Sequence, residues 1–246
     1  MSGLLAAELL KLQTVRGTWG YLLTVMGLSA LVAAATIGSR TRDELLGRTF
    51  QAELVTDAAG TTTFIALLFG ITLVTTEFRY GTITSALLAT PRRAVFLASK
   101  ILAASAAGVA LAALALVIVA VVGLLWLPAI DVPLDLGQTW RPACRILVAA
   151  LVAGAIGAGF GGIVHAQVPA LIGALIWLLV AEPLLGAVLS LLDVAVADYL
   201  PASVVFAMSD PTVEGLAFLP ATAVGLAYVA AVAVIGWIRT DHRDLT

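Results

Sequence analysis

The sequence predicts an all-α polytopic membrane protein with six transmembrane helices, and three observations lead to this fold class. Of its 246 residues, 61% are hydrophobic and only 11% are charged, whereas soluble domains are about 45–50% apolar and about 25% charged. A single soluble core of this length does not hide so much apolar surface. The apolar residues also fall into runs of roughly 20, the length that crosses a bilayer as a helix.

The N-terminal part predicts an interfacial helix over residues 3–16, followed by a first span over 17–38. Three leucines recur at i, i+4 and i+7 in the first segment, while Glu8 and Lys11 point elsewhere, a pattern typical of a helix that lies on a membrane surface. The apolar run that follows is longer than the h-region of a signal peptide, and the acidic Glu8 precedes it. We therefore expect this segment to remain as a membrane anchor.

Five further apolar runs predict the other spans, over residues 58–77, 94–127, 144–164, 168–192 and 215–238. Most of the fourth and fifth spans comes from one long run, residues 146–181, without Asp, Glu, Lys or Arg. His165 and Gln167 interrupt it with polar side chains, and Pro169 suits the first turn of a new helix. We therefore divide this run into two helices.

Six spans place both termini on one side, and the basic residues indicate that this side is the cytoplasm. With that orientation, eight of the 13 Lys and Arg residues lie in cytoplasmic segments, in agreement with the positive-inside rule. The cytoplasmic ones are Lys11, Arg16, Arg79, Arg92, Arg93, Lys100, Arg239 and Arg243, and the external ones are Arg40, Arg42, Arg48, Arg141 and Arg145.

The stretch "TTEFRYGTITSALLATPRRAVFLASK", residues 75–100, is polar and lies between spans two and three. Gly81 permits a sharp turn, Thr82 suits a helix N-cap, and Pro91 suits a first helical position. Ile83 and Leu87 share one helix face, with Leu88 beside them. Such an apolar ridge fits a groove on another protein. The alternative, an ordinary positive-inside loop, explains the basic residues but not the apolar ridge.

Two charged residues flank this ridge and carry predictions of their own. Glu77 lies where the second span meets the cytoplasm, and we expect it to pair with Arg79, Arg93 or Lys100 or to cap the short helix. Lys100 is expected to extend toward the lipid headgroups.

The same stretch resembles the signature of bacterial ABC transporter permeases of the type-2 exporter family. Eight spaced positions carry the resemblance, namely Glu77, Arg79, Gly81, Thr82, Leu88, Pro91, Arg93 and Lys100. The six-span layout and the N-terminal interfacial helix also resemble that family. The resemblance implies that residues 79–91 form a cytoplasmic coupling helix that docks on an ATPase, with Ile83 and Leu87 in its ridge.

The resemblance further implies a transport subunit that is not itself an enzyme and that lies in the bacterial cytoplasmic membrane. Its expected partners are soluble ABC ATPases, the lipid bilayer, and a second copy of the permease or a paralogous one, but no nucleic acid. ATP and Mg²⁺ are expected on the ATPase, because this chain has no G-x-x-x-x-G-K-[ST] phosphate loop. We expect no metal site, since Cys144 is the single cysteine and His165 and His242 lie far apart.

One intramembrane residue is a candidate for the transport path. Glu182, followed by Pro183, lies within the fifth span, where an ionisable residue is costly. It either pairs with Arg141 or Arg145 or contacts the cargo. In the resembling family, short external re-entrant helices often follow this span, which implies such a segment at 193–214.

Gly157 and Gly161 form a G-x-x-x-G pattern within a stripe of small residues in the fourth span. Small residues let membrane helices approach closely. We favour packing inside one subunit over a dimer seam, and a smooth sliding surface is a further reading.

Two other functions remain open at this point. An ion-gradient-driven secondary transporter predicts inverted repeats and several carboxylates near the midplane, whereas the sequence shows no repeat and one such carboxylate. A non-transporting membrane scaffold is also compatible with the sequence. The Leu-, Ala- and Val-rich spans suit a hydrophobic or amphipathic cargo, such as an antibiotic, a drug or a lipid-like molecule.

Overall fold

A computed structural model describes residues 16–81, 93–192, 196–213 and 215–241. This part of the chain is helical and contains no strand, and six helical segments in it are long and apolar enough to cross a membrane. The predicted fold class is confirmed. The segments are α2 (Arg16–Ser39), α4 and α5 (Phe50–Gly60 and Thr62–Arg79), α7 (Arg93–Trp126), α8 (Trp140–Val164), α9 to α10 (Gln167–Ile176 and Glu182–Leu191), and α12 (Phe218–Asp241).

The second segment begins earlier than the run of uncharged residues indicates. Residues from Phe50 onward are already helical, and α4 continues into α5 with only Thr61 between them. Asp57 does not end the helix, because its side chain is exposed while its neighbours Val55 and Ala58 are buried. A charge on the outer face of an amphipathic helix is compatible with a longer helix.

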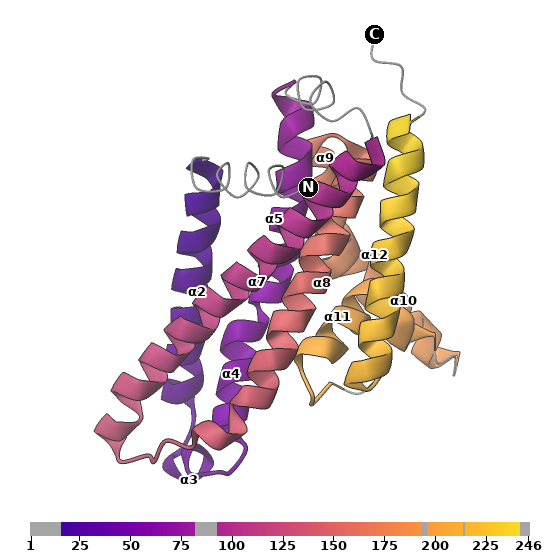
Figure 1. Ribbon diagram of the computed structural model, residues 1–246. Helices are drawn as coiled ribbons and strands as arrows, with labels where there is room; N and C mark the ends of the chain where they lie inside the picture. Colours follow the sequence, from indigo (N-terminus) through magenta and orange to yellow (C-terminus); the bar gives the residue numbers. More distant parts are fainter. Residues whose placement is uncertain (1–15, 82–92, 193–195, 214, 242–246) are drawn as a thin grey trace.

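Helix α8 lies at the centre of the bundle, where its small residues allow the neighbouring backbones to approach (Figure 1). A Cβ atom at Gly157 would lie 2.1 Å from the carbonyl oxygen of Leu67 in α5. A Cβ atom at Gly154 would lie 2.6 Å from the carbonyl oxygen of Ala104 in α7, and one at Gly159 would collide with a side chain of α12. The small-residue stripe therefore packs within one subunit.

Between the fifth and sixth segments, the chain forms two short helices, η4 (Ala197–Tyr199) and α11 (Pro201–Ser209). Pro201 opens α11, which suits a residue without a backbone N–H group. Val204 and Met208 of α11 are fully buried against α8 and α12. A short helix is thus packed into the bundle within the predicted 193–214 segment, and its re-entrant placement in a membrane stays a prediction.

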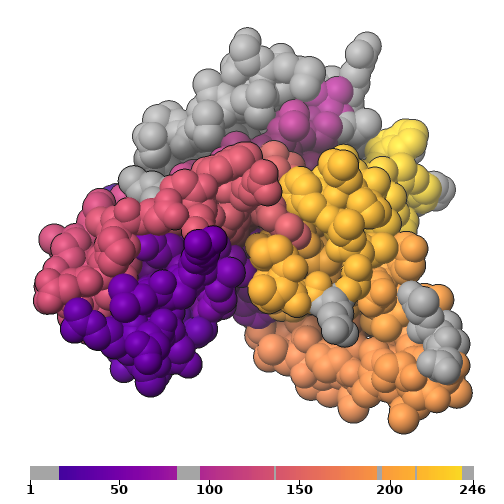
Figure 2. All heavy atoms as spheres, turned by 90° about the horizontal axis from the view of Figure 1, so that it is seen from below, coloured from indigo at the N-terminus to yellow at the C-terminus, as the bar shows by residue number. Residues whose placement is uncertain are grey.

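The two ends of the bundle differ in what they hold. Helices α2 and α7 begin at the same end where α5 and α12 finish, and we call this the terminal end (Figure 1). The opposite end holds α3 (Arg42–Leu45), and we call it the α3 end. Figure 2 looks onto the α3 end, with the indigo residues of α2 to α4 on one side and the orange and yellow later residues on the other.

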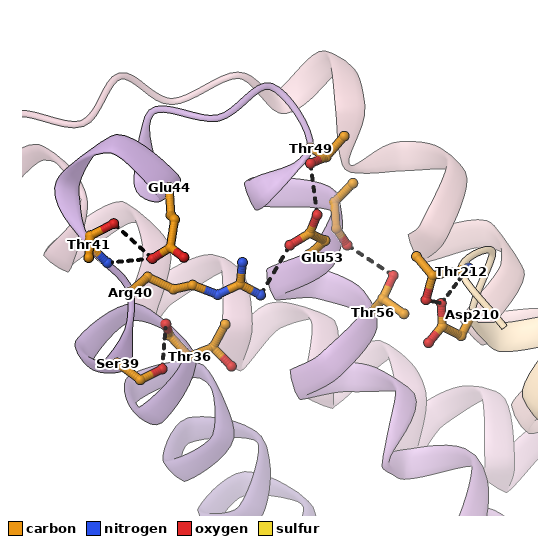
Figure 3. A network of polar contacts seen from close by, with 11 residues as sticks. Thr36, Ser39, Arg40, Thr41, Glu44, Thr49, Glu53, Thr56, Asp210 and Thr212 are labelled. Carbon is orange, nitrogen blue, oxygen red and sulfur yellow. Dashed lines mark hydrogen bonds and ion pairs between the residues drawn. The ribbon is translucent and has the colours of Figure 1, made fainter.

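At the α3 end, hydrogen bonds and an ion pair connect the polar residues of the chain between α2 and α4 (Figure 3). The Arg40 guanidinium lies 3.1 Å from the Glu53 carboxylate, to which the Thr49 hydroxyl also donates. The Glu44 carboxylate accepts hydrogen bonds from the backbone N–H and the hydroxyl of Thr41, and these bonds lower the pKa of Glu44.

Two predicted segments lie largely outside the described residues. These are residues 3–15 of the interfacial helix and residues 82–91 of the coupling helix, including Thr82, Ile83, Leu87, Leu88 and Pro91. Both helices stay predictions from the sequence.

Candidate functional site

A buried ion pair joins α5 to α7 at the terminal end. The Nζ atom of Lys100 donates to Oε1 of Glu77 over 2.5 Å, and the two side chains are 1% and 8% exposed. The two residues meet because α5 runs toward this end and α7 runs away from it. The predicted pairing of Glu77 with a nearby base is confirmed for Lys100.

Lys100 does not extend to the bilayer surface as the sequence suggested. Its side chain is one of the most completely buried in the described chain. An ammonium group reaches toward headgroups when no counterion is available at depth, but here the Glu77 carboxylate lies beside it. The expectation that Lys100 reaches the headgroups is therefore wrong.

Arg79, the last residue of α5, contacts Gln167, the first residue of α9. One guanidinium nitrogen donates to Oε1 of Gln167 over 3.0 Å, and the guanidinium also lies 5.6 Å from the ring centroid of Tyr80. Gly81 follows with φ of 67°, a left-handed conformation that glycine adopts without strain. This conformation supports the predicted change of chain direction at Gly81.

An aromatic contact ties α8 into the same end. The Phe78 and His165 rings meet edge to face, with centroids 4.3 Å apart. His165 ends α8 in a left-handed conformation, and its backbone N–H donates to Gly161. Sequence reasoning assigned His165 only to a turn, because contacts between residues so far apart in the chain leave no spacing pattern. Together with the ion pair, these contacts hold α5, α7, α8 and α9 together at the terminal end, where α5 ends and α7 begins.

Glu182 occupies a second site, deep between α10 and α11. Its side chain is buried, and it directly follows a π-helical turn, η3 (Trp177–Ala181). The widened turn lets residues five apart meet, and Nε1 of Trp177 donates to Oε2 of Glu182 over 2.8 Å. Oε1 accepts from the backbone N–H of Ser203 over 2.7 Å and from the Ser203 hydroxyl over 3.2 Å.

These contacts make Glu182 a cap for α11, supplied by a distant part of the chain. Ser203 lies in the first turn of α11, where backbone N–H groups have no partner inside the helix. A carboxylate at a helix N-terminus is also favoured by the partial positive charge there.

Arg145 of α8 holds the opposite end of α11. Its guanidinium donates to the carbonyl oxygens of Met208 and Ala207 over 3.1 Å and 2.8 Å. These carbonyls belong to the last turn of the helix, where a positive charge is favoured. Helix α11 is therefore held between a carboxylate at its N-terminus and a guanidinium at its C-terminus.

This arrangement corrects the predicted pairing of Glu182 with Arg141 or Arg145, which the structure does not form. Glu182 contacts Ser203 and Arg145 contacts Met208, so five residues at about 1.5 Å each separate the two contacts by roughly 7.5 Å along α11. Arg141 lies instead over the ring of Trp140, 5.4 Å from its centroid. The charges are complementary, but each has a backbone partner on α11 or an aromatic partner nearby.

An apolar cavity of about 210 Å³ lies beside Glu182, between α5, α8, the fifth segment, α11 and α12. It is lined by Thr63, Phe64, Leu67, Ile156, Gly157, Phe160, Ala174, Trp177, Leu178, Pro201, Ala202, Val205, Phe206, Tyr228 and Val232. Trp177 thus lines the cavity and also binds Glu182. Neither the cavity nor its link to Glu182 has a signal in the sequence.

No protein-family model and no curated protein matches the sequence. Function is therefore inferred from the residues and contacts described above.

Proposed function

We propose that this chain is the membrane-spanning permease subunit of an ATP-driven ABC exporter in the bacterial cytoplasmic membrane. Two permeases, identical or paralogous, form the translocation path, and a soluble ATPase binds each at the terminal end. The terminal end then faces the cytoplasm, as do both termini. The six apolar helices are compatible with a membrane transporter subunit. The stretch between α5 and α7 supports the more specific proposal of an ABC exporter permease.

The observation that carries the proposal is the buried Glu77–Lys100 pair at the base of that stretch. Both residues belong to the set of positions on which the family resemblance rests. Buried charges are retained at a desolvation cost, and here the pair joins the two helices that flank residues 82–92. A displacement of this segment by an ATPase would therefore move α5 and α7 together.

Arg79, Phe78 and their partners extend this connection to α8 and α9. ATP binding brings the two ATPases together, and residues 79–91 transmit that movement to the four helices. Transport follows if ATP has different affinities for the two arrangements of the membrane helices. The cargo is hydrophobic or amphipathic, in keeping with the apolar spans.

The test is co-purification of the permease with an ATPase that carries a phosphate loop and hydrolyses ATP. Truncating a residue at the centre of an interface typically costs about 2 kcal/mol or more, whereas charges at the rim contribute little. Leu87→Asp should therefore release the ATPase and abolish ATP-dependent transport in vesicles. Arg92→Gln, at matched expression, is the control and should retain most of both.

Two results would contradict the proposal. Equal retention of the ATPase by Leu87→Asp and the unmodified protein would remove residues 82–90 from the interface. Transport driven by a proton or sodium gradient without ATP would replace the exporter with a secondary transporter.

A further inference from the structure

The cavity beside Glu182 has walls without free polar groups. Three of its lining side chains carry a polar atom, and each such atom donates a hydrogen bond away from the cavity. The Thr63 hydroxyl donates to Gly60, the Tyr228 hydroxyl donates to Tyr199, and Trp177 donates to Glu182. The remaining lining side chains are hydrocarbon or glycine. A polar ligand would therefore lose hydrogen bonds to water on entry and find no free side-chain donor to replace them.

The volume of the cavity limits the size of its ligand. A cavity of about 150 Å³ with hydrocarbon walls stays dry and binds benzene, whereas pockets for whole drug-sized molecules have about 300–1,000 Å³. At about 210 Å³, this cavity has room for a segment of a hydrocarbon chain. The rest of such a molecule would stay outside.

The mouth of the cavity opens among exposed apolar side chains of a membrane-spanning segment. Trp177 and Phe206 line the cavity and are 40% and 50% exposed. Around Trp177, the fifth segment exposes Leu179, Val180 and Leu184. These apolar side chains lie within a segment long enough to cross the membrane. In a bilayer, the molecules in contact with such a surface are lipid acyl chains.

We propose that this cavity binds one acyl chain of a bilayer lipid, which enters between Trp177 and α11. Glu182 is a positioning residue for the site, because it fixes both walls, through Trp177 on one side and Ser203 on the other. The acyl chain fills space that would otherwise lack contacts and so supports α11 on the side of Ala202 and Val205, while Val204 and Met208 pack into the bundle. This inference does not rest on the proposed function.

The test uses the full chain reconstituted in vesicles of phosphatidylcholine that carries a diazirine midway along one acyl chain. After irradiation, adducts are mapped by peptide mass spectrometry. We expect adducts on the lining residues Ala174, Ala202 and Val205, although these are at most 8% exposed. Adducts on the exposed Leu184 serve as the reference for ordinary lipid contact. Adducts confined to exposed residues would overturn the proposal.

Two cavity-filling variants from opposite walls, Ala202→Leu and Ala174→Leu, should each lose the adducts at the unsubstituted buried positions while Leu184 remains labelled. Ala223→Leu makes the same change at an exposed position of α12 and should label like the unmodified protein. Unchanged buried labelling in a filling variant that still elutes as a single folded species would refute the site.

A second arm identifies the source of the hydrocarbon. A dodecyl amphiphile with a diazirine in its chain is added to vesicles of unlabelled phosphatidylcholine. Buried labelling by the phosphatidylcholine probe supports the assignment to bilayer lipid. Buried labelling by the amphiphile alone would assign the cavity to a transported molecule and overturn it.

Discussion

The buried Glu77–Lys100 pair predicts a large and specific loss of stability when one partner is removed. Lys100→Met keeps a long, flexible side chain but takes the ammonium away from a carboxylate whose side chain is 8% exposed. Removing one member of a buried ion pair typically costs about 3–5 kcal/mol, because the other charge stays buried. In a chain of this size, each kcal/mol lowers the melting temperature by about 2–4 °C. We therefore expect Lys100→Met to melt roughly 6 °C or more below the unmodified protein.

The double variant Glu77→Gln/Lys100→Met separates the pair from its surroundings. Replacing both charges removes the uncompensated group, so the double variant should be more stable than the sum of the two single losses indicates. Coupling energies between residues in contact are typically about 0.5–3 kcal/mol. All variants are melted in one detergent and followed by far-UV circular dichroism and by intrinsic fluorescence.

Arg79→Met is the control for loss of a positive charge at the same end. Its hydrogen bond to Gln167 is exposed, and exposed polar contacts of this kind contribute at most about 1 kcal/mol. An unchanged melting temperature for Lys100→Met would refute the reasoning, as would strictly additive losses in the double variant. Either result would mean that the pair does not hold α5 to α7.

Three further predictions concern other parts of the bundle. Glu182→Leu should destabilise the protein by about 1–3 kcal/mol, because it leaves donors buried without an acceptor, and melting in detergent with unchanged ATPase retention checks this. Gly157→Ala should lose about 1–3 kcal/mol by overpacking against α5, whereas Gly173→Ala, with open space around it, should be neutral or stabilising. The depressed pKa of Glu44 means that its contact with Thr41 is fully present above the carboxylate's ordinary pKa of about 4.3 and is lost as the pH falls through the folded-state value. Thr41→Val should raise the pKa of Glu44, as measured by carbon-detected NMR titration, and no change would contradict the assignment.

The membrane class and the approximate position of each span follow from the sequence alone. Lipid offers no hydrogen-bond partners to the backbone, so an uncharged run of about 20 residues must be helical there. This constraint depends only on local composition. Local composition was also enough to predict that the small residues of α8 allow close helix packing. It was likewise enough to predict that Glu77, at the end of a span, has a basic residue nearby.

The partners of individual charges depend on the tertiary structure. Glu77 had three bases near it in sequence, and its contact with Lys100 depends on the antiparallel arrangement of α5 and α7, which the sequence does not show. Glu182 had two arginines as candidate partners, but its carboxylate binds a backbone N–H of α11 instead. Every non-proline residue carries a backbone N–H group. The sequence therefore does not show which N–H group at a helix N-terminus will bind a distant carboxylate. The cavity follows from the same cause, since its walls come from five parts of the chain that meet only after the helices have packed.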